Sequence, residues 1–162
     1  MKNISNVSSW KYSKFTSNKN FSFNRKYILK YVSSKLLNDS YQSIKKWKSY
    51  KTTPLLSLEK LNQKLKLKNI FYKDESKRFG LKSFKALGGA YAVEKITKGR
   101  KDITVSTATA GNHGKSVAWG AKNLGLCCKI FISENVSETR AGEMRNLNAE
   151  VIRVKGNYED SL

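Results

Sequence analysis

Residues 103–154 read ITVSTATAGNHGKSVAWGAKNLGLCCKIFISENVSETRAGEMRNLNAEVIRV. Their pattern predicts the fold class of this chain. It begins with a run rich in β-branched residues, Ile103–Ala108, which predicts a strand. Apolar residues then recur at helical spacing from Asn112 to Leu124, which predicts a helix that ends at Gly125. The stretch therefore opens with a strand followed by a helix.

The same alternation continues to the end of the stretch. A short apolar run predicts a strand over Cys128–Ile132, a helix follows over about Thr139–Leu147, and Val151–Val154 predicts a third strand. Strands that alternate with helices through short connections are typical of parallel crossover units. Residues 103–162 therefore form a βαβαβ unit, and the predicted fold class is α/β, with a parallel sheet covered by helices on both faces.

The residues before this unit give weaker patterns. Residues 1–25 are basic, rich in Asn and Ser and without a sustained period, which predicts a poorly ordered arm. One or two helices are expected between residues 27 and 50, and a strand is expected at Ile70–Lys73. Pro54 predicts an extended segment before a short helix over Leu58–Leu67, and Ser83 can cap a helix whose buried side would carry Phe84, Leu87 and Tyr91.

The charge of the chain is strongly positive but unevenly distributed. The 162 residues carry a net charge of +20, from 32 Lys and Arg against 12 Asp and Glu. Residues 1–68 hold 16 basic and 2 acidic side chains, whereas residues 69–162 hold 16 and 10. If this charge served nucleic acid, binding would depend steeply on salt and would map to residues 1–68. We expect no specific nucleic acid, because the excess lies mainly outside the recognisable motifs.

Other features of the composition bear on location. Cys127 and Cys128 are adjacent and have no second pair at metal-ligand spacing, so they are read as two small buried residues in a strand, and no metal is expected. No apolar run approaches the length of a membrane span, and residues 1–25 contain no continuous apolar segment of a signal peptide. These residues resemble a transit peptide only in being basic and free of acids. A cytoplasmic protein without membrane contact is expected.

The first stretch that suggests chemistry is KDESKRFGLKSFKALGGAY, residues 73–91. It places Lys85 in the first turn of a predicted helix, where the positive end of the helix dipole favours the neutral, nucleophilic amine. Gly88 and Gly89 remove side-chain bulk one turn later, so another element can pack closely there. The alternative reading is ordinary, because most lysines on helices are solvated surface residues.

The second stretch is TATAGNHG, residues 107–114, which leaves a strand and opens a helix. Free backbone N–H groups at a helix start bind anions, and glycine lets a carboxylate approach the backbone. Asn112 adds a neutral donor. The alternative is a simple turn with His113 as a packed aromatic residue. Neither stretch contains a Walker or dinucleotide fingerprint, which argues against nucleotide binding.

Together the two stretches resemble the fold-type II pyridoxal-phosphate (PLP) enzymes, the group of tryptophan synthase β-subunits and serine/threonine dehydratases. The order Lys-Asp-Glu-Ser, Arg-Phe-Gly-Leu, Phe-Lys and Leu-Gly-Gly, followed by Gly-Asn-His-Gly and Val117-Ala118-Trp119, is most similar to diaminopropionate ammonia-lyases. The resemblance covers about residues 40–162, so residues 26–162 are expected to form an incomplete PLP-enzyme domain.

The resemblance implies roles for particular residues. Lys85 would hold PLP covalently and act as the catalytic lysine, and Asn112 would bind the cofactor's ring hydroxyl. The substrate carboxylate would be bound by the loop made of Thr109, Ala110, Gly111, Asn112 and His113. The implied reaction eliminates ammonia from 2,3-diaminopropionate to give pyruvate and ammonia, and the implied full-length enzyme is a homodimer acting on a small amino acid.

Three departures from the family pattern keep alternatives open. Ammonia-lyases usually have an acid before Gly-Asn-His-Gly, but this chain has Ala110, as in many serine/threonine dehydratases. The interval between Tyr91 and Ile103 is shorter than expected. The Gly-rich loop that binds the cofactor phosphate, and the partner of the pyridine nitrogen, would lie beyond Leu162. We therefore expect a truncated chain that is inactive alone, and a non-catalytic remnant of a broken gene is a further alternative.

Overall fold

The computed structural model describes residues 25–162, which fall into two compact units that divide after Leu37. The predicted arm lies outside the described residues except for Arg25, which begins helix α1 (Arg25–Tyr31). Helix α2 (Ser34–Lys45) follows it, so the prediction of one or two helices between residues 27 and 50 is confirmed. No residue of α2 is buried.

The next elements form an antiparallel two-stranded ribbon. Strand β1 (Leu55–Ser57) pairs with β2 (Phe71–Lys73), and the short helix α3 (Glu59–Leu65) connects them. The residues of both strands are exposed. The extended segment after Pro54, the short helix and the strand before Asp74 were all predicted from the sequence. The helix and the second strand are each shorter than predicted.

Helix α4 (Lys85–Thr97) begins at the lysine that the sequence singled out. The predicted buried side is wrong, since Phe84 is 66% exposed and Leu87 and Tyr91 are only partly buried. The buried side consists instead of small or β-branched residues: Ala86, Gly89, Ala90, Val93 and Thr97. The physical reason is that α4 lies close against the next helix, where large side chains would not fit.

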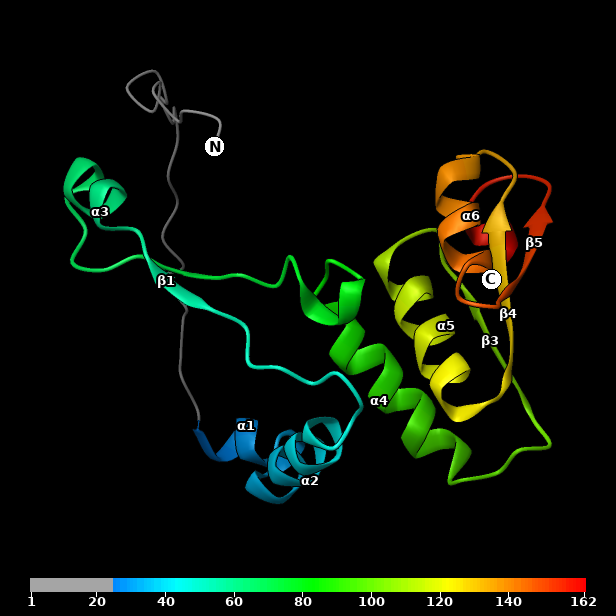
Figure 1. Cartoon of the computed structure of the whole chain (residues 1–162), viewed down its shortest axis with the longest axis horizontal. Coiled ribbons are helices and arrows are strands. Elements are labelled where there is room, and N and C mark those ends of the chain that lie inside the picture. The colour runs from blue at the N-terminus through cyan, green and yellow to red at the C-terminus, as the bar shows by residue number, and fades with distance from the viewer. Residues whose placement is uncertain (1–24) are drawn as a thin grey trace. The chain divides into compact units, whose positions relative to one another are not determined.

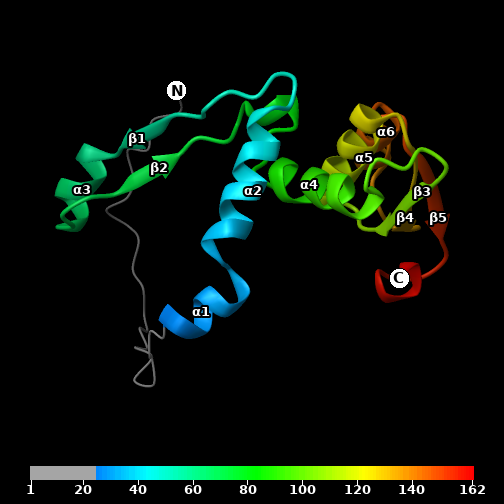
Figure 2. The same cartoon turned by 90° about the horizontal axis from the view of Figure 1, so that it is seen from below.

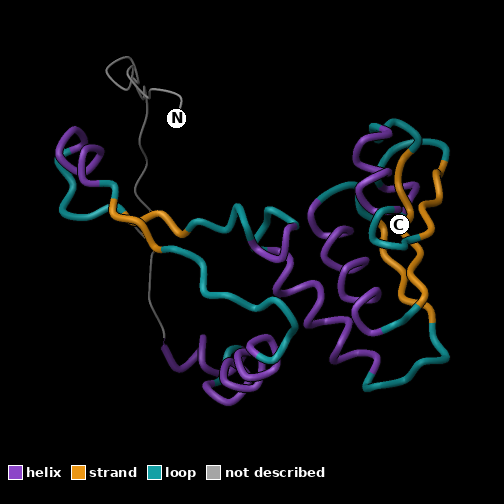
Figure 3. Tube along the Cα trace, viewed as in Figure 1, coloured by secondary structure: helices purple, strands orange, loops and turns teal. Residues whose placement is uncertain are grey.

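Residues 104–154 form the predicted alternation. The strands are β3 (Thr104–Ala108), β4 (Cys127–Ser133) and β5 (Glu150–Val154), and the helices between them are α5 (Asn112–Leu124) and α6 (Glu138–Arg145). The strands pair in parallel in the order β3-β4-β5. Figure 3 shows this alternation, and a 3-10 turn over Glu159–Ser161 follows the last strand. The α/β class and the parallel sheet are confirmed.

The core lies on one face of this sheet. Cys128, Ile130 and Ile132 alternate along β4 and pack against residues of α5 and α6. Both helices lie on that side of the strands (Figures 1 and 2). Right-handed crossovers between strands in sequential order place successive helices on the same face, which explains the arrangement. On the other face of β4, Cys127 and Lys129 are exposed, so the cover on both faces is not found among residues 103–162. The prediction that both cysteines are buried is therefore wrong for Cys127 and holds for Cys128, because neighbouring residues of a strand point to opposite faces.

Candidate active site

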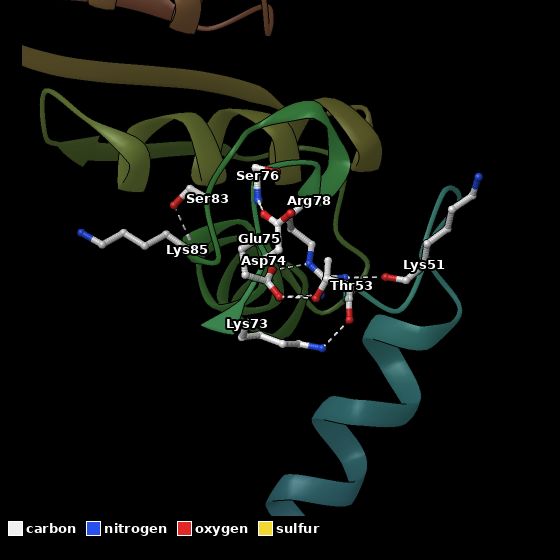
Figure 4. A network of polar contacts seen from close by, with 9 residues as sticks. All are labelled: Lys51, Thr53, Lys73, Asp74, Glu75, Ser76, Arg78, Ser83 and Lys85. Carbon is white, nitrogen blue, oxygen red and sulfur yellow. Dashed lines mark hydrogen bonds and ion pairs between the residues drawn. The ribbon is translucent and has the colours of Figure 1, made fainter. Parts of the chain in front are cut away.

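Lys85 is the first residue of α4, and its backbone is held at both ends. Its N–H donates to the Ser83 hydroxyl at 3.2 Å, as predicted for a serine at a helix start, and its carbonyl accepts from the Ser116 hydroxyl at 2.6 Å. Its side chain is exposed, and among residues 25–162 its amino group has no hydrogen bond or ion pair. Figure 4 shows this side chain extended away from neighbouring polar groups. The amine is therefore available to a ligand.

The turn that leads into α4 has an unusual backbone. Phe79, Gly80 and Lys82 all have positive φ angles, of 48°, 73° and 57°, which favour glycine and are uncommon for the other two residues. The Phe79 ring stacks on Trp119 of α5 with their centroids 4.5 Å apart, and Trp47 packs against both rings. This aromatic contact fixes the turn on α5, the helix that also carries Asn112.

A second anchor for this turn is Arg78, which is only 5% exposed. Its guanidinium donates two hydrogen bonds to Glu75, of 2.6 and 3.0 Å, and one each to Thr53 and the carbonyl of Lys51 (Figure 4). The hydrogen bonds from Arg78 hold the pKa of Glu75 below its ordinary value. The network connects the segment before β1 to the turn before Lys85, and no pattern in the sequence predicted it.

The loop between β3 and α5 provides the donors of the second predicted stretch. Gly111 precedes the helix, and no side chain caps the first amide groups of α5. A Cβ added at Gly111 would have no atom within 4 Å, so the backbone there is open to a ligand. Asn112 and His113 are exposed, which does not support the alternative reading of His113 as a packed aromatic residue.

A pocket of about 290 Å³ lies beside this helix start. It is lined by Ala110, Gly111, Asn112, Lys115, Arg140 and Glu143. Lys115 pairs with Glu143 at 3.2 Å, whereas Ala110 contributes only a methyl group. Of the five residues predicted to bind a carboxylate, three line this pocket. Thr109 does not line the pocket. It directly follows β3, and its N–H donates to the carbonyl of Phe131 at 3.0 Å.

One residue that sequence reasoning missed joins the two stretches. Ser116 lies one turn after Asn112 on α5, is fully buried, and bonds to the backbone of α4 at both Lys85 and Ala90. The sequence did predict that an element packs closely at Gly88 and Gly89. Ser116 fills the space beside Gly89, whereas Gly88 is exposed and has open space around it. A serine one turn into the helix after Gly-Asn-His-Gly was the available signal.

Comparison with known proteins assigns the family. Residues 47–162 match the family described as pyridoxal-phosphate dependent enzymes. The chain belongs to this PLP-dependent family. The fold-type II resemblance and the expected cofactor, PLP, are thereby confirmed at the level of the family.

Individual relatives are similar to this PLP-family chain over most of its length. Diaminopropionate ammonia-lyase from Escherichia coli strain K12 is 37% identical over 147 residues, which cover 80% of this chain and 36% of that protein. The Salmonella typhimurium strain LT2 enzyme of the same name is 39% identical, covering 73% and 35%. The biosynthetic L-threonine dehydratase of Haemophilus influenzae is 33% identical, covering 71% and 22%. The chain thus spans about a third of the length of the ammonia-lyases it matches.

Solved structures of the family agree with these matches. The Escherichia coli diaminopropionate ammonia-lyase in its apo form superposes with a TM-score of 0.75 at 35% identity, covering 80% of this chain and 40% of that chain. The processed threonine deaminase isoform 2 of Solanum lycopersicum gives 0.68 at 25% identity, covering 89% and 38%. The fold of this chain is therefore that of part of a fold-type II PLP enzyme.

The residues present fit the family cofactor. PLP carries an aldehyde, which a free ε-amine binds, and its amino-acid substrate carries a carboxylate, which unpaired amide N–H groups bind. The structure offers the exposed Lys85 amine, the uncapped start of α5 and the open backbone at Gly111. Among residues 25–162 there is no group of three or more His, Cys, Asp or Glu side chains placed to hold a metal. In the same range, no helix has the length and apolar character needed to cross a bilayer.

Proposed function

We propose that this chain is the lysine-bearing part of a PLP-dependent ammonia-lyase that acts on 2,3-diaminopropionate. The reaction consumes one water and converts the substrate to pyruvate and two ammonia molecules. The observation that carries the proposal is the free Lys85 amine at the start of α4, on a backbone bonded to the helix that begins at Asn112. Similarity to two diaminopropionate ammonia-lyases supports the substrate.

Each of these residues has a proposed role in the reaction. When bound, PLP withdraws electrons from the substrate's α-carbon and so makes its proton easier to remove. Lys85 would hold the cofactor, and its amine is the group placed to move a proton. Asn112 would donate to the cofactor's ring oxygen, and the open amides around Gly111 would bind the substrate carboxylate. The full-length protein is proposed to be a cytoplasmic homodimer, and the exposed free thiol of Cys127 suits a reducing compartment.

A serine/threonine dehydratase activity is the second candidate. Ala110 favours it, because a methyl group cannot accept a proton where ammonia-lyases of this type usually carry an acid. The pocket beside Ala110 does contain the carboxylate of Glu143, which is paired with Lys115. The similarity to a threonine dehydratase gives the same candidate independent support.

Product stoichiometry distinguishes the two activities. The product of the whole gene, loaded with PLP, is offered 2,3-diaminopropionate, serine and threonine in separate assays of ammonia and 2-keto acid. The proposal expects two ammonia per pyruvate from 2,3-diaminopropionate and at most slow release from the hydroxy amino acids. Release of one ammonia per keto acid from serine or threonine, without reaction of 2,3-diaminopropionate, would favour the dehydratase. Because the chain spans about a third of its relatives, we expect the 162-residue chain alone to bind PLP weakly and to turn over little.

A further inference from the structure

The strongest unassigned feature is the buried hydroxyl of Ser116. It accepts a hydrogen bond from the Ala90 N–H at 3.1 Å and donates one to the Lys85 carbonyl at 2.6 Å. A serine hydroxyl has only one proton to donate, so donation to Lys85 fixes its orientation. These two bonds span the first and second turns of α4 from a single point on α5.

The packing around Ser116 leaves no free space between α4 and α5. A Cβ placed on Gly89 would collide with the Ser116 hydroxyl and would lie 2.7 Å from its Cβ. One turn further along, a Cβ on Gly120 would lie 2.8 Å from the Cα of Ala90. The two helices therefore approach closely at two successive points, first through the Ser116 side chain and then between the backbones at Gly120 and Ala90. As a result, α4 cannot slide or rotate on α5 without breaking contacts.

We infer that Ser116 is a positioning residue, which holds the carbonyl of Lys85 and so aims the Lys85 amine relative to the start of α5. The inference rests on the proposed role of Lys85. Because Ser83 already holds the N–H of Lys85, the two serines fix the peptide groups on both sides of the lysine while its side chain stays free. A reactive group whose backbone is fixed reacts faster because less orientational freedom has to be lost.

The test compares labelling of Lys85 with that of Lys82, an exposed lysine three residues earlier. The product of the whole gene is incubated with PLP, the lysine–cofactor bond is reduced with borohydride, and the pyridoxyl groups are located by peptide mapping. We expect Lys85 to be labelled in preference to Lys82. Ser116→Ala should lower the Lys85 to Lys82 ratio about ten-fold, as the loss of one buried hydrogen bond allows.

Ser133→Ala is the matched control. The Ser133 hydroxyl also donates to a backbone carbonyl at 2.6 Å, that of Gly156. Ser133 is the last residue of β4 and Gly156 follows β5, so neither residue belongs to α4 or α5. Its loss should leave the labelling ratio unchanged. Equal losses in Ser116→Ala and Ser133→Ala would mean general destabilisation and would overturn the positioning role, as would an unchanged ratio in Ser116→Ala.

Two further results separate this inference from the proposed function. Absence of preferential label on Lys85 in the unmodified chain would refute the role of Lys85 itself. If Ser116→Ala does not fold, NMR of the unmodified chain provides the second measurement. A slowly exchanging Ser116 hydroxyl proton with a nuclear Overhauser contact to the backbone of α4 supports the inference, and its absence in the folded chain overturns it.

Discussion

Among single residues, the two glycines after Lys85 differ in how closely α5 packs against them. Gly88 and Gly89 are neighbours in sequence but face opposite environments. Gly89 is buried against Ser116, whereas a Cβ on Gly88 would meet no atom within 4 Å. The sequence predicted a close approach at this pair, and only the packing of α4 on α5 shows which of the two glycines requires it.

This contrast gives a paired prediction. Gly89→Ala should destabilise the fold by about 1–3 kcal/mol, because its methyl group overlaps Ser116. Gly88→Ala should stabilise it by roughly 0.5–1 kcal/mol, because alanine is the better helix former at an unobstructed position. Urea unfolding of both variants measures the difference. Equal effects of the two substitutions would contradict the observed orientation of α4.

The adjacent cysteines provide a second residue-scale prediction. Cys127 is exposed, whereas burial raises the pKa of the Cys128 thiol to about 11. The thiolate is the reactive form, so at pH 8 Cys127 should react with a thiol reagent rapidly and Cys128 only after unfolding. A chromogenic disulfide titration should count one fast thiol and a second in denaturant. Cys127→Ser should remove the fast phase, and two fast thiols in the native chain would contradict the assignment of faces along β4.

Among the elements, the alternation of strands and helices was predicted well, because β3 and β5 are rich in β-branched residues, β4 is a short apolar run, and short connections join them to the helices. The buried side of α4 was misplaced, because Phe84, Leu87 and Tyr91 are the obvious apolar residues and the true contact uses Ala and Gly. The Arg78 network could not be predicted either, since Lys51 and Thr53 approach Arg78 only after the chain has folded back.

That network predicts a pH dependence. The pKa of Glu75 is lowered by its hydrogen bonds to Arg78, so its contribution to stability is fully present above the pKa of the unfolded chain and is lost as the pH falls through the lower folded value. Glu75→Gln should cost roughly 3 kcal/mol at neutral pH, because it leaves Arg78 buried without its charged partner. Urea unfolding from pH 7 to pH 3 should show the two proteins converging as the pH falls. A constant difference would contradict the role of the ion pair.

For the whole molecule, the family was predicted from the resemblance of the two motifs, which the local apolar patterns alone could not have indicated. Two separate stretches resembled PLP enzymes, and the side-chain hydroxyl of Ser116, two residues after the second stretch, bonds to the backbone of the first at Lys85 and Ala90. Among the described residues, no basic side chain of residues 25–68 lines the pocket beside Gly111. Because the chain spans about a third of its relatives, the partners of the cofactor's phosphate and ring nitrogen could not be predicted from these residues.

The proposed role of Lys85 as the lysine that binds PLP can be tested by the visible absorption band of lysine-bound cofactor. PLP is titrated into the product of the whole gene, into its Lys85→Ala variant and into its Lys82→Ala variant, which removes an exposed lysine three residues away. We predict a band in the unmodified protein that persists in Lys82→Ala and disappears in Lys85→Ala. A band of undiminished strength in Lys85→Ala would contradict the claim.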